Sequence, residues 1–122
     1  MDKDTKKKLV FAILQGDDYE QVVRELNKNG FYVTLLNSVG GFLKKRSVTI
    51  MIGVEEVRLE ELLDILRDEA GERIETVYQT PAVTGGPMMG IPPTIPMDVN
   101  CGGVTIFVLD MDQMVRLSLI HI

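Results

Sequence analysis

The apolar residues of this chain fall into short runs that alternate with amphipathic stretches, and this pattern predicts strands and helices in turn. Residues 9–14 form a continuous apolar run whose length suits a buried strand better than a helix. The apolar residues that follow recur at spacings of three, four and seven, the repeat of one helical face: Tyr19, Val22, Val23 and Leu26. Residues 31–36 are rich in aromatic and β-branched side chains, which indicates a second strand.

Polar residues mark the two ends of that first helix. Asp17 or Asp18 is expected to cap its start, because a side-chain carboxylate can accept hydrogen bonds from the free amides of the first turn. Asn29 and Gly30 are expected to end it, because both residue types tolerate the left-handed conformation that closes a helix.

The pattern then repeats. Residues 48–54 predict a third strand antiparallel to the second, residues 55–69 an amphipathic helix, and residues 73–79 a fourth strand. The order strand-helix-strand-strand-helix-strand is that of an α+β, ferredoxin-like βαββαβ fold, in which two helices cover one face of an antiparallel sheet. The other face keeps apolar side chains, so we expect copies of the chain to associate through it.

A stretch rich in proline and glycine follows the predicted fourth strand. Residues 80–96 hold too many of both residue types for regular structure, so we expect a long irregular loop there. Residues 104–109 form the most strand-like run of the chain and predict an extra C-terminal strand. We expect this strand to pair either with the sheet or with residues 97–101 across a turn at Gly102 and Gly103.

Length and composition support one ordered domain. The chain has 122 residues, of which 45% are hydrophobic and 25% charged, as in an average globular protein. We expect a single domain over residues 1–122, with a polar tail at 1–7 and an unassigned tail at 117–122. The net charge of −5 argues against general nucleic-acid binding. The polar start and the lack of a long apolar run favour a cytoplasmic protein.

The loop at residues 40–46 is the strongest candidate for ligand chemistry. Two glycines, Gly40 and Gly41, would let backbone amides approach an anion closely. The loop also carries Phe42, whose ring can stack on a base, and three consecutive cationic residues at 44–46. Glycine, aromatic and basic residues together suit a nucleotide, although an ordinary solvated hairpin tip has the same composition. The loop matches no known phosphate-binding motif.

Residues that commonly carry catalysis or metal binding are scarce. The only histidine, His121, lies one residue from the end, so no internal histidine can act as a general base. The only cysteine, Cys101, excludes an internal disulfide and a multi-cysteine metal site, and is interpreted as a half-buried structural residue. Asp110 and Asp112 are interpreted as exposed carboxylates. We expect no enzyme, no metal and no cofactor.

The order of these pieces resembles the cyclic di-AMP receptor family of PII-like signal proteins. Similarity extends from Lys8 to about Arg116 and rests on two stretches. The first runs from Gly30-Phe31-Tyr32-Val33-Thr34 through Gly40-Gly41-Phe42-Leu43 to the strand that contains Gly53. The second is the stretch at residues 99–109, which contains the pair Gly102-Gly103 and Phe107.

The resemblance implies a PII-like homotrimer that binds cyclic di-AMP at subunit boundaries, between the short loop after the second strand and the long proline-glycine loop. It implies signal transduction to a protein partner when ligand binding orders the loops. The ligand contacts that it implies are Thr34, Gly41, Phe42, Leu43, Gly53 and Phe107.

Three further candidate contacts depart from the family pattern. Family members usually have arginine, asparagine and glutamine where this chain has Tyr32, Ser47 and Arg116. The departures leave a second hypothesis open: a PII-like trimer that binds another nucleotide or an anionic metabolite. A small ferredoxin-like enzyme is a third reading, which the lack of an internal histidine disfavours.

Overall fold

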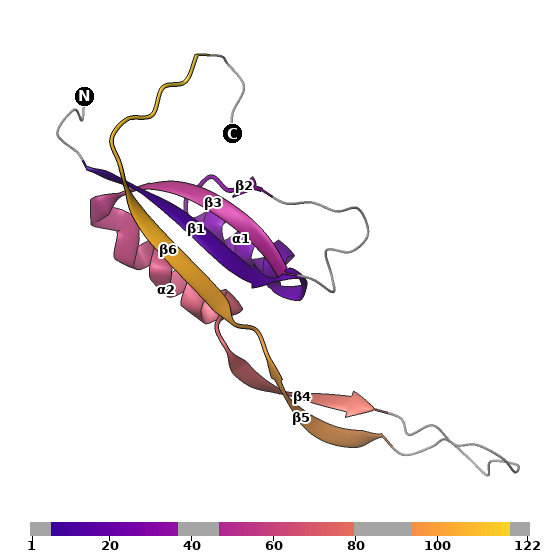
Figure 1. The fold of residues 1–122 in the computed structure, drawn as a ribbon. Coiled ribbons are helices and arrows are strands. Elements are labelled where there is room, and N and C mark those ends of the chain that lie inside the picture. Colours follow the sequence, from indigo (N-terminus) through magenta and orange to yellow (C-terminus); the bar gives the residue numbers. More distant parts are fainter. Residues whose placement is uncertain (1–5, 37–46, 80–93, 118–122) are drawn as a thin grey trace, which may run out of the picture.

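The computed structural model describes residues 6–36, 47–79 and 94–117. Its helices and strands follow the predicted alternation, with a 3-10 turn before each helix (Figure 1). In chain order they are β1 (Lys7–Gln15), η1 (Gly16–Asp18), α1 (Tyr19–Lys28), β2 (Thr34–Leu35), β3 (Ser47–Glu55), η3 (Glu56–Arg58), α2 (Leu59–Ala70), β4 (Arg73–Gln79), β5 (Ile95–Cys101) and β6 (Val104–Met111).

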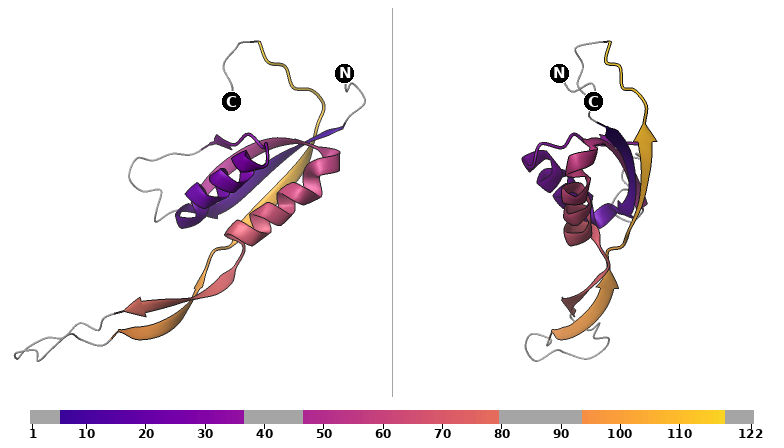
Figure 2. Two further views of the ribbon diagram at one scale, coloured as in Figure 1. Left: turned by 180° about the vertical axis from the view of Figure 1, so that it is seen from behind. Right: turned by 90° about the vertical axis from the view of Figure 1, so that its left-hand side faces the viewer.

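Four strands form the main sheet, in the order β2-β3-β1-β6, and all neighbours are antiparallel. The two helices lie on one face of this sheet, and the opposite face is uncovered (Figure 2). We refer to the main sheet and its two helices as the body. The predicted α+β, ferredoxin-like arrangement is therefore confirmed, as is the antiparallel pairing of the second and third strands.

The core of the body lies between the sheet and the helices. Alternate residues of β1 and β3 point into it, and Val10, Ala12, Val48, Ile50 and Ile52 are all 0% exposed. Leu26 of α1 and Leu62 and Leu66 of α2 pack against them and are equally buried. The alternation is the expected signature of a sheet that is buried on one face.

The helix ends differ in part from the prediction. Gly30 has φ +87°, so the expected glycine closes α1 in the left-handed region. Asp18 occupies the N-cap position of α1, as predicted, but its side chain makes no hydrogen bond to the first turn. Its carboxylate binds Arg73 instead, an ion pair described below. In the described parts of the chain, no helix is long and apolar enough to span a membrane.

The predicted fourth strand is a strand, but it does not join the main sheet. β4 pairs with β5, and the two project from the end of the body as a two-stranded arm (Figure 1). β6 occupies the fourth position in the main sheet, where its residues Val104 to Met111 pair with Leu14 to Lys7 of β1. Two of its residues, Val104 and Ile106, pack against the core, whereas Ile74 and Tyr78 of β4 are 69% and 70% exposed.

Two boundaries were also predicted wrongly. Only residues 34 and 35 of the predicted second strand are regular, although the preceding Phe31 is buried in the core. The irregular loop was expected to reach residue 96, but Ile95 and Pro96 belong to β5. Pro96 lies opposite Tyr78 in a two-stranded sheet, and proline within sheets is found mainly on edge strands such as this one.

Candidate functional site

The uncovered face of the main sheet, called the open face below, carries an apolar surface. The strand register sets one row of side chains across all four strands: Thr34, Met51, Phe11 and Phe107. A second row places Gly53 beside Leu9 and Leu109. Phe107 is 52% exposed and Leu109 47%, values that are unusual for large apolar residues on a regular strand. Such a surface is typical of a contact with another protein or another copy.

Several predicted ligand residues share this open face. Thr34 and Phe107 belong to its first row and Gly53 to its second. Ser47 lies at the start of β3 with the same alternation as Met51, so its side chain is also on the open face. The candidate residues on strands β2, β3 and β6 therefore lie on one surface of the fold.

Within one chain, however, these residues do not form one cluster. Thr34 lies on the edge strand β2 and Phe107 on the opposite edge strand β6, with Met51 and Phe11 between them. Three strand spacings separate the two edges, about 14 Å. The candidate contacts on the open face thus divide into a β2–β3 group and a β6 group.

The remaining candidates extend this division. Tyr32 precedes β2 and is 67% exposed, so it belongs to the β2–β3 side. Arg116 is exposed and follows the end of β6. Gly41, Phe42 and Leu43, with the rest of the glycine-basic loop at 40–46, lie outside the described residues. Ser47 is the first described residue after that loop.

Gly53 is closely approached by the last residue of β6. A Cβ on Gly53 would lie 3.4 Å from the Cε atom of Met111, an ordinary to slightly tight contact with a flexible side chain. Met111 therefore borders the space in front of Gly53, and the space over Gly53 depends on where this methionine turns. The predicted role of Gly53, to leave room for a ligand, stays a prediction.

An open hollow lies where the arm leaves the body, with a volume of about 610 Å³. One wall is the base of the arm, by which we mean the links that join it to the body at Gly71, Glu72 and Gly103, and another is the start of β3 at Ser47. The rest of the lining comes from β1, β6 and α2: Ile13, Leu14, Gln15, Val104, Thr105, Ile106 and Arg67. The hollow thus connects one predicted ligand residue to the base of the arm.

A separate group of ion pairs lies at the end of the sheet away from the arm, where β1 begins. The Lys8 ammonium contacts the Asp110 carboxylate, and it lies 3.6 Å from Glu56. Lys8 holds the pKa of Asp110 below its usual range, and Asp110 in turn raises the pKa of Lys8. Asp110 is therefore one half of an ion pair. Within the described ranges, no group of three metal-ligating residues is present.

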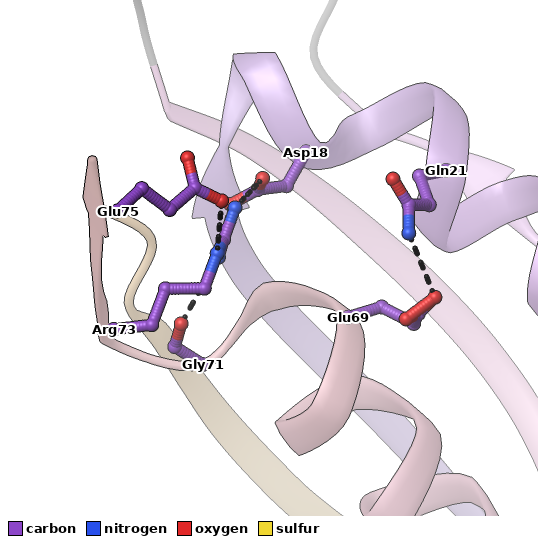
Figure 3. A network of polar contacts seen from close by, with 6 residues as sticks. All are labelled: Asp18, Gln21, Glu69, Gly71, Arg73 and Glu75. Atoms are coloured by element: carbon purple, nitrogen blue, oxygen red, sulfur yellow. Dashed lines mark hydrogen bonds and ion pairs between the residues drawn. The ribbon is translucent and has the colours of Figure 1, made fainter. Parts of the chain in front are cut away.

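A polar network that the sequence does not predict lies at the base of the arm (Figure 3). The Arg73 guanidinium donates to both carboxylate oxygens of Asp18, at 2.6 and 3.3 Å, and to the Gly71 carbonyl at 3.1 Å. It also binds Glu75 at 2.9 Å. Asp18 and Arg73 are 55 positions apart, and neither stands in a motif, so no local signal in the sequence could have paired them.

Comparison with known proteins gives consistent results. Residues 7–117 match the family model described as "Cyclic-di-AMP receptor". A crystal structure of a functionally unknown protein from Pediococcus pentosaceus is 32% identical, with a TM-score of 0.69, covering 93% of this chain and 99% of that one. A citrate-bound PII protein from Arabidopsis thaliana is similar in fold, with 22% identity and a TM-score of 0.55, covering 96% of this chain and 88% of that one.

Proposed function

This chain belongs to the cyclic-di-AMP receptor family, and from that premise we propose that it binds cyclic di-AMP between the subunits of a PII-like homotrimer. The observation that carries the proposal is the division of the candidate contacts between the two edges of one sheet. A binding site made from both edges requires that two copies meet, because the two groups of residues lie too far apart within one copy.

The open face supports the assembly. Its central row is apolar from Met51 to Phe107, and leaving such a surface in water is unfavourable by roughly 25 cal/mol for each Å². In a closed ring each copy meets the next through two different surfaces. A ring of three copies therefore brings the β2–β3 edge of one copy next to the β6 edge of its neighbour.

The chemistry of the two edges suits a nucleotide. Thr34 offers a hydroxyl that can bond a phosphate or a base, and Phe107 offers a half-exposed ring on which a purine can stack. Arg116 adds a cation beyond β6, and Tyr32 adds a second exposed ring before β2. Gly41, Phe42 and Leu43 complete the proposed site from the glycine-basic loop. Binding would order the loops and so present a surface to a protein partner.

Calorimetric titration with cyclic di-AMP tests this function. We expect saturable binding with one ligand per chain and no comparable heat from cyclic di-GMP, ATP or AMP at the same concentration. Thr34→Ala removes a hydroxyl from a half-buried site, so it should weaken binding about fivefold to a hundredfold without changing the assembly. The absence of heat at high protein concentration would overturn cyclic di-AMP as the ligand.

The departures at Tyr32, Ser47 and Arg116 favour a second candidate function. If these residues remove contacts to cyclic di-AMP, the trimer binds another nucleotide or an anionic metabolite at the same boundary. A thermal-shift panel of nucleotides and small carboxylates separates the two, because only a bound compound raises the melting temperature in proportion to the logarithm of its concentration. Stabilisation by a compound other than cyclic di-AMP, with none by cyclic di-AMP, would favour this candidate.

A further inference from the structure

We propose that Arg73 is a positioning residue: its ion pair with Asp18 holds the arm, and with it one wall of the hollow beside Ser47, at a single angle to the body. A two-stranded sheet has little stability of its own in water. Of the residues described in β4 and β5, none is buried, so packing within the arm supplies no core.

Few contacts join the arm to the body, and they gather at one place. β4 and β5 pair with each other, whereas the main sheet consists of the other four strands. The joint itself consists of Arg73 at the start of β4, paired in register with Cys101 at the end of β5. Arg73 reaches across to Asp18, which stands at the end of η1 in the body.

Among the ion pairs of the described residues, Asp18–Arg73 has the most buried carboxylate. The side chain of Asp18 is only 9% exposed and that of Arg73 32%. Charged groups removed from water in this way are strongly destabilising when one partner is lost, because the other charge stays buried and unpaired. The guanidinium also has a fixed planar shape, so bonding to Asp18, Glu75 and the Gly71 carbonyl together fixes its direction.

The second strand of the arm is held at the same point. Gly103 donates its backbone N–H to the Ala70 carbonyl at 2.8 Å. Gly102 has φ +78°, and a Cβ there would overlap both the Gly71 carbonyl oxygen and the Nη1 atom of Arg73. The end of α2, the start of β4 and the turn into β6 are therefore packed around one guanidinium. A change in its bonding moves both strands of the arm together.

Charge supports the same reading. Asp18 and Glu75 raise the pKa of Arg73 further above its usual value, so the cation persists at every physiological pH. Arg73 lowers the pKa of Glu75, with a contribution from a hydrogen bond to Cys101. Burial, and then Glu75, raises the pKa of the Cys101 thiol, so this cysteine is held as a neutral hydrogen-bonding group inside the joint.

The control for arm position and exchange is an ion pair between the same residue types, with the same shortest N–O distance, at an exposed location. Arg67 and Asp64 lie 2.6 Å apart on the surface of α2, with side chains 66% and 61% exposed. Asp18 and Arg73 are also 2.6 Å apart. Asp18→Asn and Asp64→Asn are therefore the same chemical change at the same distance, and only the first removes a charge from the base of the arm.

The test measures the position and the local stability of the arm. Spin labels on Asp68→Cys in α2 and Tyr78→Cys in β4, in a Cys101→Ser background and diluted with unlabelled chains, report the distance between body and arm. Amide hydrogen exchange reports the stability of β4 and β5. We expect one narrow distance distribution in the parent protein and in Asp64→Asn. In Asp18→Asn we expect a broad distribution and arm exchange at least about tenfold faster, since charge-assisted bonds are lost.

Arg73→Lys keeps the charge but not the planar fork, so it should fold and still loosen the arm. An arm that is unchanged in both Asp18→Asn and Arg73→Lys would overturn the proposal. Equal acceleration of exchange in β1 and β3 would also overturn it, because the pair would then be a general stabiliser rather than a joint.

The consequence for the ligand rests on the proposed function. Because the base of the arm forms a wall of the hollow at Ser47, a loosened arm should weaken cyclic di-AMP binding about tenfold. Glu61→Gln, which breaks the ion pair with Arg58 and touches no residue of the hollow, should leave the affinity unchanged. Unchanged affinity in a variant with a loosened arm would contradict the positioning role. If the parent protein binds no cyclic di-AMP, the proposed function fails, and the distance and exchange data still decide whether the joint exists.

Discussion

The body and the arm differ in how they are stabilised. In the body, alternate residues of β1 from Val10 to Leu14 and of β3 from Val48 to Val54 are buried, and the largest of these side chains are almost fully removed from water. The arm has two strands and exposed apolar side chains such as Ile74 and Tyr78. The body is therefore stabilised by its own core, whereas the arm depends on its joint and on whatever covers it in an assembly.

This contrast explains the placement of the candidate site. A self-sufficient body can expose an apolar open face, because that face is not needed to hold the fold together. The open face is then available for contact with other copies, and the arm extends beyond the edge of the body (Figure 2). The function that we propose belongs to the surfaces that the core leaves unused.

The largest effect is expected from a charge on the open face. Leu109 is 47% exposed in one chain, and in the proposed trimer it is buried in each of the three copies. Leu109→Asp should abolish the trimer, because each copy would place an unpaired carboxylate in an apolar contact at a cost of several kcal/mol. Sedimentation velocity should show monomers with a native circular dichroism spectrum. Val57→Asp, at a position 84% exposed beside the helices, should remain trimeric. A trimeric Leu109→Asp variant would contradict the proposed use of this face.

Matched truncations of one isoleucine in the body and one in the arm test directly whether only the body has a core. Ile50 is 0% exposed in the body and Ile74 is 69% exposed in the arm. Ile50→Ala should lower the free energy of unfolding by about 2–5 kcal/mol, through lost burial and a new cavity. Ile74→Ala should change it by less than about 0.5 kcal/mol. Urea denaturation measures both, and equal losses would show that the arm contains a core of its own.

Two neighbouring glycines, Gly102 and Gly103, provide a test of how tightly the joint is packed. Gly102 and Gly103 both have positive φ, 78° and 111°, so alanine at either position is strained by about 1–3 kcal/mol. A Cβ on Gly102 would also overlap Gly71 and Arg73, whereas a Cβ on Gly103 would meet no heavy atom within 4 Å. Hydrogen exchange in the arm should therefore be faster in Gly102→Ala than in Gly103→Ala. The reverse order would argue against a crowded joint.

The smallest effect is expected from acid, and it should affect arm and body alike. The arginines Arg73 and Arg58 lower the pKa values of Glu75 and Glu61, respectively, and Lys8 lowers that of Asp110. A carboxylate with a lowered folded-state pKa stabilises the fold above its unfolded-state pKa and loses this contribution as the pH falls through the folded-state value. The melting temperature should fall modestly between about pH 5 and about pH 3, and added salt should reduce the fall. A melting temperature that rises on acidification would contradict these ion pairs.

The body was predictable because its signals are local and periodic. Local patterns predict the structure that forms at residues 9–14, in the helical repeat from Tyr19 to Leu26 and at Gly30, which ends the helix. The exchange of β4 for β6 in the main sheet was not predictable in the same way, since both are good strands. It depends on which of them supplies apolar residues to a face already formed, and β6 does so with Val104 and Ile106.

The candidate site was predictable only in part. Resemblance to a family selected Thr34, Gly53 and Phe107, and the strand register explains why they share the open face. The Asp18–Arg73 pair was not predictable, because a buried ion pair between distant positions leaves no periodic or compositional trace. The sequence predicts a cap at Asp17 or Asp18, and Asp18 holds the N-cap position, but nothing local indicates that its carboxylate binds Arg73.

The central claim is that each nucleotide site takes residues from two copies, and mixing two defective variants tests it most directly. Thr34→Ala should weaken binding through the β2–β3 side of a site and Phe107→Ala through the β6 side, with both variants still trimeric by sedimentation. When the two are unfolded, mixed in equal amounts and refolded together, about a quarter of the boundaries in random trimers combine two intact sides. We predict cyclic di-AMP binding with parental affinity at about a quarter of the sites. No recovery on mixing, with each variant defective alone, would contradict a site shared between copies.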